Sequence, residues 1–284
     1  MPHSIRLALF VTATTLGLIG TGVNSASADM PERDEREHLR VCADGNNLPF
    51  TNREEQGFEN RIAQLLAEDM GNPLTYVWAP QIMGFVRNTL ELRVCDVIMG
   101  VAAGYEFVQG SNAYYRSVYS LIVPEGSDIE ITSLNDPSLQ DRRIGVIAET
   151  PPVVPLRRAG ASIKGYPLQV DTRVRAPVKD AIEDIVAGIT EGAVLWGPIA
   201  GYYAAQQEPA LKVIPLVDDT TGAHLQYRIT MGIRHGEPQW KDTLNDFIDR
   251  RQDDINAILA DYNVPLLDRH GQLIDEGARD SEWI

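Results

Sequence analysis

Short apolar segments typical of strands alternate with amphipathic helical segments between residues 39 and 100. The order is strand, helix, strand, helix, strand, and apolar residues recur at helical spacing in the longer intervening segment. Strands that alternate with helices in this way pair in parallel, because each helix returns the chain across one face of the sheet. We therefore predict a parallel sheet with strands at 39–43, 74–78 and 95–100 and helices at 58–70 and 85–92.

A polar, turn-rich stretch at residues 125–139 separates this block from a second one with the same rhythm. Thr150 is followed by two prolines, which is typical of an N-cap and a first helical turn. Two such blocks predict an α/β protein with two lobes, whose strand ends and helix N-termini surround a shared ligand-binding crevice. The remaining predicted strands are at 119–124, 143–147, 193–196, 211–217 and 226–234, and the remaining helices follow Thr150 or lie at 178–186, 198–206, 240–247 and 255–262.

The first 28 residues have the order of a secretory signal. A short basic segment ending at Arg6 precedes an uncharged apolar run at 7–23, and Ala26-Ser27-Ala28 matches a cleavage site. Thr and Gly interrupt the apolar run, which argues against a membrane anchor or a buried helix. We predict cleavage after Ala28, a flexible leader at 29–37 and a periplasmic mature chain. No later stretch approaches the roughly 20 apolar residues of a membrane span.

The chain is acidic, with a net charge of −15. This charge disfavours binding to nucleic acid or to anionic membranes. It permits association with a basic protein partner or with cations, although the charge alone favours a solvated acidic surface without any partner.

Cys42 and Cys95 are the two cysteines of the chain. An even number in an oxidising compartment predicts one disulfide, which would stabilise the fold by about 4 kcal/mol. The alternative is a pair of buried thiols in neighbouring strands. The histidines lack the spacing of metal ligands, so we predict no metal site. The sequence also contains no Gly-x-Ser-x-Gly, glycine-rich phosphate-loop or HExxH motif, so we predict no catalytic site.

Several segments of the chain resemble one narrow family of proteins. The similarity spans about residues 38–266, and the segments are specific in combination. The matching strings are VCADGNNLPF (41–50), GFEN (57–60), GFVRNTL (84–90), CDVIMG (95–100), YYRS (114–117) and WGP (196–198). Together they resemble the periplasmic binding-protein-like accessories of PQQ-dependent alcohol dehydrogenases, the family represented by MxaJ and XoxJ.

The resemblance implies the type II periplasmic binding fold, with a mainly parallel sheet flanked by helices in each lobe. Lobe 1 would comprise 38–127 and 226–284, including a tail at 267–284, and lobe 2 would comprise 128–225. It also implies a non-enzymatic partner of a quinoprotein methanol or alcohol dehydrogenase and its cytochrome c, acting in maturation or activation or in the capture of a related small molecule. We expect a monomer without a cofactor. The alternatives are a receptor for a neutral or aromatic solute of an ABC importer, and an enzyme on the same scaffold.

Two charged groups that hold amino acids in related binding proteins are absent from this sequence. Those relatives carry an Arg after the third strand that binds the ligand carboxylate, but Gly100 to Tyr115 contains neither Arg nor Lys. Gly197 stands where they carry the Asp that binds the ammonium group. Burying either ligand charge without a partner would cost several kcal/mol, so amino-acid capture is disfavoured.

Aromatic and amide side chains are predicted to surround the crevice instead, which suits a neutral ligand or an inserted peptide segment. Each aromatic residue could also belong to the core, as we favour for Phe85, and each arginine could form a surface ion pair. Glu59 and Asp96 could form an acid–base pair, but solvated or capping roles are favoured for both. The predicted crevice residues are Asn46, Asn47, Phe50, Arg87, Tyr114, Tyr115, Arg116, Trp196 and Gly197.

Overall fold

The computed structural model describes residues 37–209 and 211–274. The predicted signal peptide, the leader up to residue 36 and the tail from residue 275 lie outside these residues. In the described part, no helix has the length and apolar character needed to cross a membrane.

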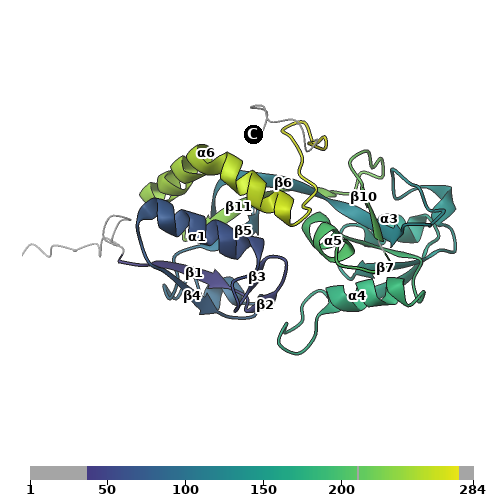
Figure 1. Cartoon of the computed structure of the whole chain (residues 1–284), viewed down its shortest axis with the longest axis horizontal. Coiled ribbons are helices and arrows are strands. Elements are labelled where there is room, and N and C mark those ends of the chain that lie inside the picture. The colour runs from purple at the N-terminus through teal and green to yellow at the C-terminus, as the bar shows by residue number, and fades with distance from the viewer. Residues whose placement is uncertain (1–36, 210, 275–284) are drawn as a thin grey trace, which may run out of the picture. The chain divides into compact units, whose positions relative to one another are not determined.

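Lobe 1 contains the first βαβ unit, in which the predicted parallel pairing is present. β1 pairs with β4 with Leu39 opposite Leu74, and Val41 forms a parallel bridge with Val97. The elements of lobe 1 are β1 (Leu39–Ala43), β2 (Asn46–Asn47), β3 (Thr51–Asn52), α1 (Phe58–Met70), β4 (Leu74–Trp78), α2 (Phe85–Asn88) and β5 (Ile98–Ala102), followed much later by β11 (Gln226–Ile233) and α6 (Pro238–Asp261) (Figure 1).

Lobe 2 contains a second set of parallel strands, with β7 between β8 and β9. Its elements are the 3₁₀ helix η2 (Pro137–Leu139), β7 (Arg143–Ile147), α3 (Val153–Arg158), β8 (Ser162–Tyr166), α4 (Pro177–Val186), β9 (Gly192–Trp196), α5 (Gly197–Ala204) and β10 (Leu211–Pro215).

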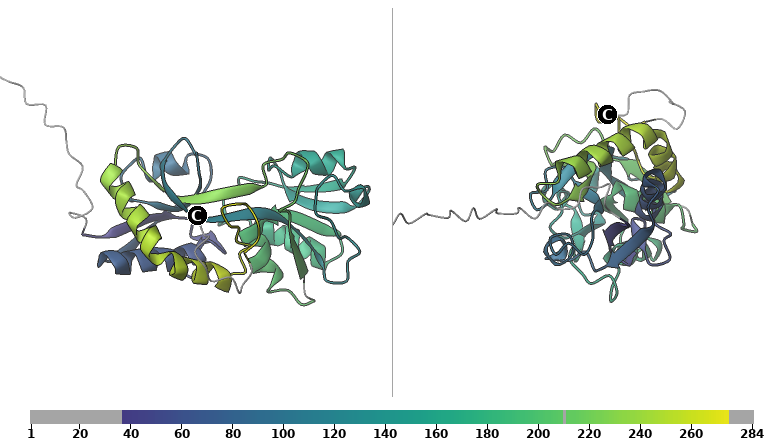
Figure 2. Two further views of the ribbon diagram at one scale, coloured as in Figure 1. Left: turned by 90° about the horizontal axis from the view of Figure 1, so that it is seen from above. Right: turned by 90° about the vertical axis from the view of Figure 1, so that its left-hand side faces the viewer.

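One long strand, β6 (Gln109–Pro124), belongs to both lobes. Its first part pairs antiparallel with β11 in lobe 1, and its last residues pair antiparallel with β9 and β10 in lobe 2. β6 and β11 lie side by side where the chain passes between the lobes (Figure 2). The two parallel sets are thus joined by antiparallel strands. The exact lobe boundaries near residues 127 and 226 stay a prediction.

Several predicted elements differ from the observed ones. α2 ends at Asn88 and not at residue 92, because Thr89 leaves the helical conformation. Thr150 does not cap a helix, since its hydroxyl donates to the Ile147 carbonyl (2.6 Å) and α3 begins only after Pro152. The strand predicted at 95–100 begins at Ile98, β6 begins ten residues before the predicted position, and β8 was not predicted. The two predicted C-terminal helices are the halves of α6, which is kinked at Arg251.

The core of lobe 1 combines residues from both ends of the described chain. Phe58 and Ile62 of α1 pack in one cluster with Trp240 and Phe247 of α6. The Trp240 indole N–H donates to the Asp96 carbonyl at 3.1 Å, which satisfies the polar atom of this buried ring. Lobe 1 is therefore complete only when α6 packs onto α1.

The predicted disulfide between Cys42 and Cys95 is confirmed. The two Cα atoms are 5.5 Å apart, within the usual range for a disulfide. Both residues are buried beside Val86, Leu90 and Ile98. The bond fixes the end of β1 to the segment that leads into β5.

Candidate functional site: the contact between the lobes

A buried carboxylate, Asp44, lies directly after β1 and holds three segments together. Only 1 % of Asp44 is exposed. One carboxylate oxygen accepts hydrogen bonds from the Asn46 N–H (3.0 Å) and the Thr172 hydroxyl (2.7 Å), and the other accepts one from the Gln81 N–H (2.8 Å). Because Thr172 precedes α4, this carboxylate links lobe 1 to lobe 2.

Two further hydrogen bonds connect the segment after β1 to lobe 2. The Asn46 side-chain amide donates to the Thr172 carbonyl at 2.5 Å, and the Tyr203 hydroxyl of α5 donates to the Leu48 carbonyl at 3.1 Å. Burial raises the pKa of Tyr203 from its ordinary value of 10.0 to about 12. The chain thus supplies its own donors and acceptors for contact between the lobes.

Glu59, at the start of α1, carries a buried carboxyl group with an unusual pKa. Burial raises the pKa of Glu59 to about 8, so the group is largely protonated at neutral pH. A Cβ at Gly100 would lie 2.0 Å from a Glu59 carboxyl oxygen, so glycine is needed there to leave room for the acid. Our favoured interpretation of Glu59 as a solvated or capping residue is therefore wrong.

Asp96, the other residue of the imagined acid–base pair, is engaged in a buried ion-pair cluster. Its carboxylate accepts two hydrogen bonds from the Arg40 guanidinium, at 2.7 and 2.9 Å, and lies 3.5 Å from Arg234. This arrangement ties β1 to β11 and gives Asp96 a structural role, so solvation and helix capping are also wrong for Asp96.

The predicted aromatic residues Tyr114 and Tyr115 are part of the lobe 1 core. The Tyr114 hydroxyl donates to the Met99 carbonyl at 2.8 Å. Tyr115 and the half-buried Phe50 pack edge-on against Phe58, with ring centres 6.1 and 5.3 Å away. Burial, followed by the charge of Glu59, raises the pKa of both tyrosines well above the usual value.

Trp196 and Gly197 lie where β9 meets α5. The half-buried Trp196 ring packs edge-on against Tyr119 and Tyr227, at 5.4 and 5.7 Å. A Cβ at Gly197 would lie 2.4 Å from the Val118 carbonyl oxygen, so glycine permits the close approach of α5 to β6. In this structure Gly197 has a packing role.

The remaining predicted residues are polar and lie in three places. Asn46 and Asn47 lie beside Asp44, and the Asn47 amide donates to the Gln81 side chain at 3.0 Å. Arg116 is half-buried and donates to the Arg269 carbonyl at 3.2 Å, whereas Arg87 is exposed on α2. The structure thus places Asn46 at the contact between the lobes, bonds the Asn47 amide within lobe 1, and places both arginines in other local surroundings.

Asp44, Thr172 and Tyr203 were not among the site residues predicted from the sequence. Asp44 carried a usable signal, because a polar residue directly after a buried parallel strand lies at the edge where ligands bind. No sequence pattern pointed to Thr172 or Tyr203, because Thr172 lies in a loop and Tyr203 in a helix, and neither segment contains a recognisable motif.

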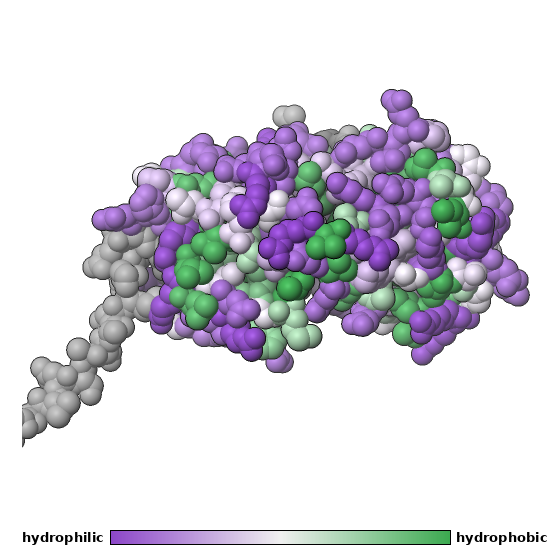
Figure 3. Space-filling view, turned by 90° about the horizontal axis from the view of Figure 1, so that it is seen from below, coloured by the Kyte–Doolittle hydropathy of each residue, from purple (hydrophilic) through white to green (hydrophobic). Residues whose placement is uncertain are grey.

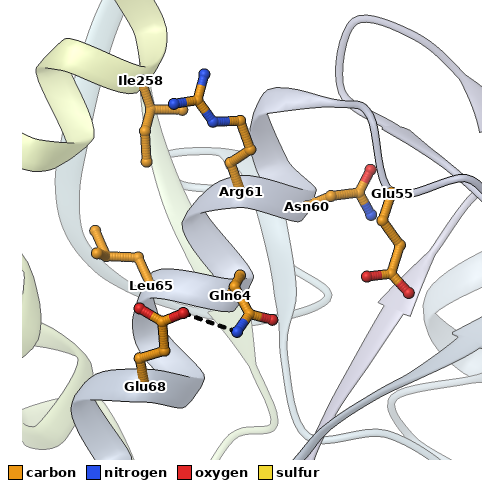
Figure 4. Close-up of a pocket in the computed structure, with 7 residues that line it drawn as sticks. All are labelled: Glu55, Asn60, Arg61, Gln64, Leu65, Glu68 and Ile258. Carbon is orange, nitrogen blue, oxygen red and sulfur yellow. Dashed lines mark hydrogen bonds between the residues drawn. The ribbon is translucent and has the colours of Figure 1, made fainter.

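A shallow surface pocket of about 250 Å³ lies on α1, beside α6 (Figure 4). Gln64 donates to Glu68, one turn later on the same helix, at 2.9 Å. None of the predicted crevice residues lines this pocket, whose lining residues are Glu55, Asn60, Arg61, Gln64, Leu65, Glu68 and Ile258.

Comparison with known proteins identifies the family of this fold. No family model matches the chain. The crystal structure of the periplasmic binding protein XoxJ from Methylobacterium extorquens AM1 is 39 % identical, with a TM-score of 0.68, and the match covers 81 % of this chain and 99 % of XoxJ. The chain belongs to the MxaJ/XoxJ family of periplasmic binding proteins.

Two further relatives agree with membership of the MxaJ/XoxJ family. The crystal structure of MxaJ from Methlophaga aminisulfidivorans MPT is 26 % identical, with a TM-score of 0.70, and the match covers 81 % of this chain and 100 % of MxaJ. Protein MoxJ of Methylorubrum extorquens is 28 % identical over 246 residues, which are 81 % of each chain. The predicted family and its two-lobed fold are confirmed.

Proposed function

We propose that this chain is a non-enzymatic periplasmic binding protein that associates with a quinoprotein methanol or alcohol dehydrogenase. Through the region where its lobes meet, it aids the maturation or activation of that enzyme. The enzyme's cytochrome c is a second proposed partner. Membership of the MxaJ/XoxJ family supports this proposal, because the sequence resembles the accessory proteins of PQQ-dependent alcohol dehydrogenases.

The observation that carries the proposal is the engagement of Asp44. A solute receptor that held an amine would need a buried carboxylate with acceptor positions open to the ligand. Asp44 instead receives hydrogen bonds from Thr172, Asn46 and Gln81 of its own chain. The lobes are therefore held together by contacts that the protein itself supplies, which suits recognition of a protein partner.

Association with the dehydrogenase is tested with the purified mature protein. We expect it to bind the apo form or the PQQ-loaded form in a calorimetric titration, and to increase the rate at which apo enzyme regains activity when PQQ is added. Trp196 and Tyr115 are unsuitable probes of this contact, since both are packed against other aromatic rings. Binding to neither form, together with tight capture of a neutral or aromatic solute, would favour the importer receptor.

Common L-amino acids at millimolar concentration should leave the melting temperature unchanged. Asp44 is occupied, Gly197 replaces an acid, and the segment from Gly100 to Tyr115 offers no cation. A ligand at 100 times its Kd would stabilise the protein by about 2.7 kcal/mol, or about 5–10 °C in a protein of this size. Thermal shift measures this, with an amino-acid-binding protein as the positive control. A clear shift with any amino acid contradicts the proposed chemistry of the site.

A further inference from the structure

The two most exposed large apolar side chains of the described residues, Met83 and Val174, are each 82 % exposed. They come from different lobes, because Met83 lies in the loop before α2 and Val174 lies in the loop before α4. Isolated apolar residues on a surface are ordinary. These two are unusual because of what lies two residues before each of them.

Both loops are fixed to the same buried carboxylate. Gln81 precedes Met83 by two residues and donates its N–H to Asp44, and Thr172 precedes Val174 by two residues and donates its hydroxyl to the other oxygen of Asp44. Asp44 therefore holds one loop from each lobe to a single carboxylate at the boundary between the lobes. Ile82, which is 39 % exposed, adds to the apolar surface on the lobe 1 side.

Both tips are also ordered by local hydrogen bonds. The Ile82 carbonyl accepts from the Phe85 N–H at 3.0 Å, and the Asp171 carbonyl accepts from the Val174 N–H at 2.9 Å. Because the backbone of these turns is already ordered, little loop entropy is lost when a partner covers them. Figure 3 shows that, on the face seen from below, apolar areas interrupt a polar surface.

We propose that Ile82, Met83 and Val174, here called the rim patch, form a docking surface for a protein partner that is complete only when the lobes are in contact. This inference rests on the proposed function and names the surface that the dehydrogenase would meet. A small solute is a poor occupant, because these side chains project from loop tips. A membrane is disfavoured by the net charge of −15.

The charges on the lobe 1 side define the chemistry of the partner. Arg53 and Arg87 are exposed, and neither forms an ion pair with any described residue; Arg53 stacks on Trp78 with its guanidinium carbon 5.6 Å from the ring centre. The partner should therefore present an apolar contact surrounded by carboxylates. The overall negative charge favours a basic partner at long range, whereas these arginines select carboxylates at the contact itself.

The first test compares single variants in binding to purified quinoprotein methanol dehydrogenase. Met83→Glu and Val174→Glu should each weaken binding by about tenfold or more, as at the centre of an interface. Leu92→Glu is the matched control, because Leu92 is 64 % exposed in lobe 1 and outside the rim patch. If the enzyme binds all four proteins equally, the proposed function stands and the rim patch is overturned.

The second test separates contact between the lobes from the patch itself. Thr172→Val removes the hydroxyl that donates to Asp44 and should weaken binding by about three- to tenfold. Thr150→Val removes a hydroxyl that bonds only within lobe 2, at 2.6 Å to the Ile147 carbonyl, and should leave binding unchanged. Equal effects of the two changes would show that the patch does not depend on the lobes meeting.

The third test applies if the dehydrogenase does not bind the wild-type protein. That result would contradict the proposed function and would leave the rim patch still to be tested. A photo-cross-linking amino acid is placed at position 83, 174 or 92 of the full chain in periplasm, and the products are identified by mass spectrometry. The rim patch stands if positions 83 and 174, but not 92, capture the same partner protein and Thr172→Val abolishes that capture. No product, or only a second copy of this chain, overturns it.

Discussion

Replacing Glu59 by glutamine should remove a large pH dependence from the stability of this protein. Burial raises the folded-state pKa of Glu59 from 4.5 to about 8. Between these values the folded protein holds a proton that the unfolded chain has released, so stability falls as the pH rises. The loss is up to about 1.4 kcal/mol for each pH unit in this window. Glutamine resembles the protonated acid and does not titrate.

The measurement is urea unfolding of the wild type and of Glu59→Gln from pH 5 to pH 9. We expect similar free energies of unfolding near pH 5 and a growing advantage for the variant up to pH 8, by several kcal/mol in total. Glu68→Gln is the control, because Glu68 is exposed on the same helix. Parallel stability curves for the wild type and Glu59→Gln would show that this carboxyl group is not desolvated.

Loss of the disulfide should have an effect of similar size. Cys42→Ala combined with Cys95→Ala should lower the free energy of unfolding by about 4 kcal/mol, because the unfolded chain regains the freedom of a loop closed across a separation of 53 residues. Denaturant unfolding of the double variant measures this loss, and unfolding of the wild type with and without dithiothreitol is the independent check. A change below about 1 kcal/mol would mean that the cross-link adds little to the packing around it.

The elements that the sequence predicted well are those with local signals. Apolar spacing and a terminating glycine marked α1, whose last turn ends at Gly71 with φ of 68°. The first half of β6 lacked such a signal, since it begins with the polar run Gln109-Gly110-Ser111-Asn112. It is a strand because it pairs with β11, which lies more than a hundred residues later.

Local backbone irregularity explains why Tyr114 and Tyr115, which we predicted to line a crevice, are both buried in this structure. Neighbouring residues of a regular strand point to opposite faces, so one of two consecutive tyrosines should face outward. In β6, Thr230 of β11 pairs with Ala113 and Ile229 pairs with Tyr115, so Tyr114 is an extra residue in the ladder. This bulge allows both tyrosines to be buried. No pattern in the sequence predicted the bulge.

The candidate site was predicted only in part, for a similar reason. Asn46 and Asn47 were predicted among the amide side chains of the crevice, and the Asn46 amide donates to the Thr172 carbonyl of lobe 2. The partner of Asp44 is Thr172, at a separation of 128 residues. Only the folded arrangement of two lobes brings that hydroxyl to the carboxylate.

The construction of lobe 1 from both ends of the described chain determines the order in which the protein can become complete during export. A chain that crosses the inner membrane from its N-terminus delivers Phe58, Ile62 and Leu66 to the periplasm well before Trp240 and Phe247, against which they are finally buried. The strands and helices of lobe 2 arrive in between. Lobe 1, which begins to cross the membrane first, is therefore the last part whose core can be completed. Until α6 arrives, the apolar face of α1 must be covered by a chaperone or by transient collapse of the chain.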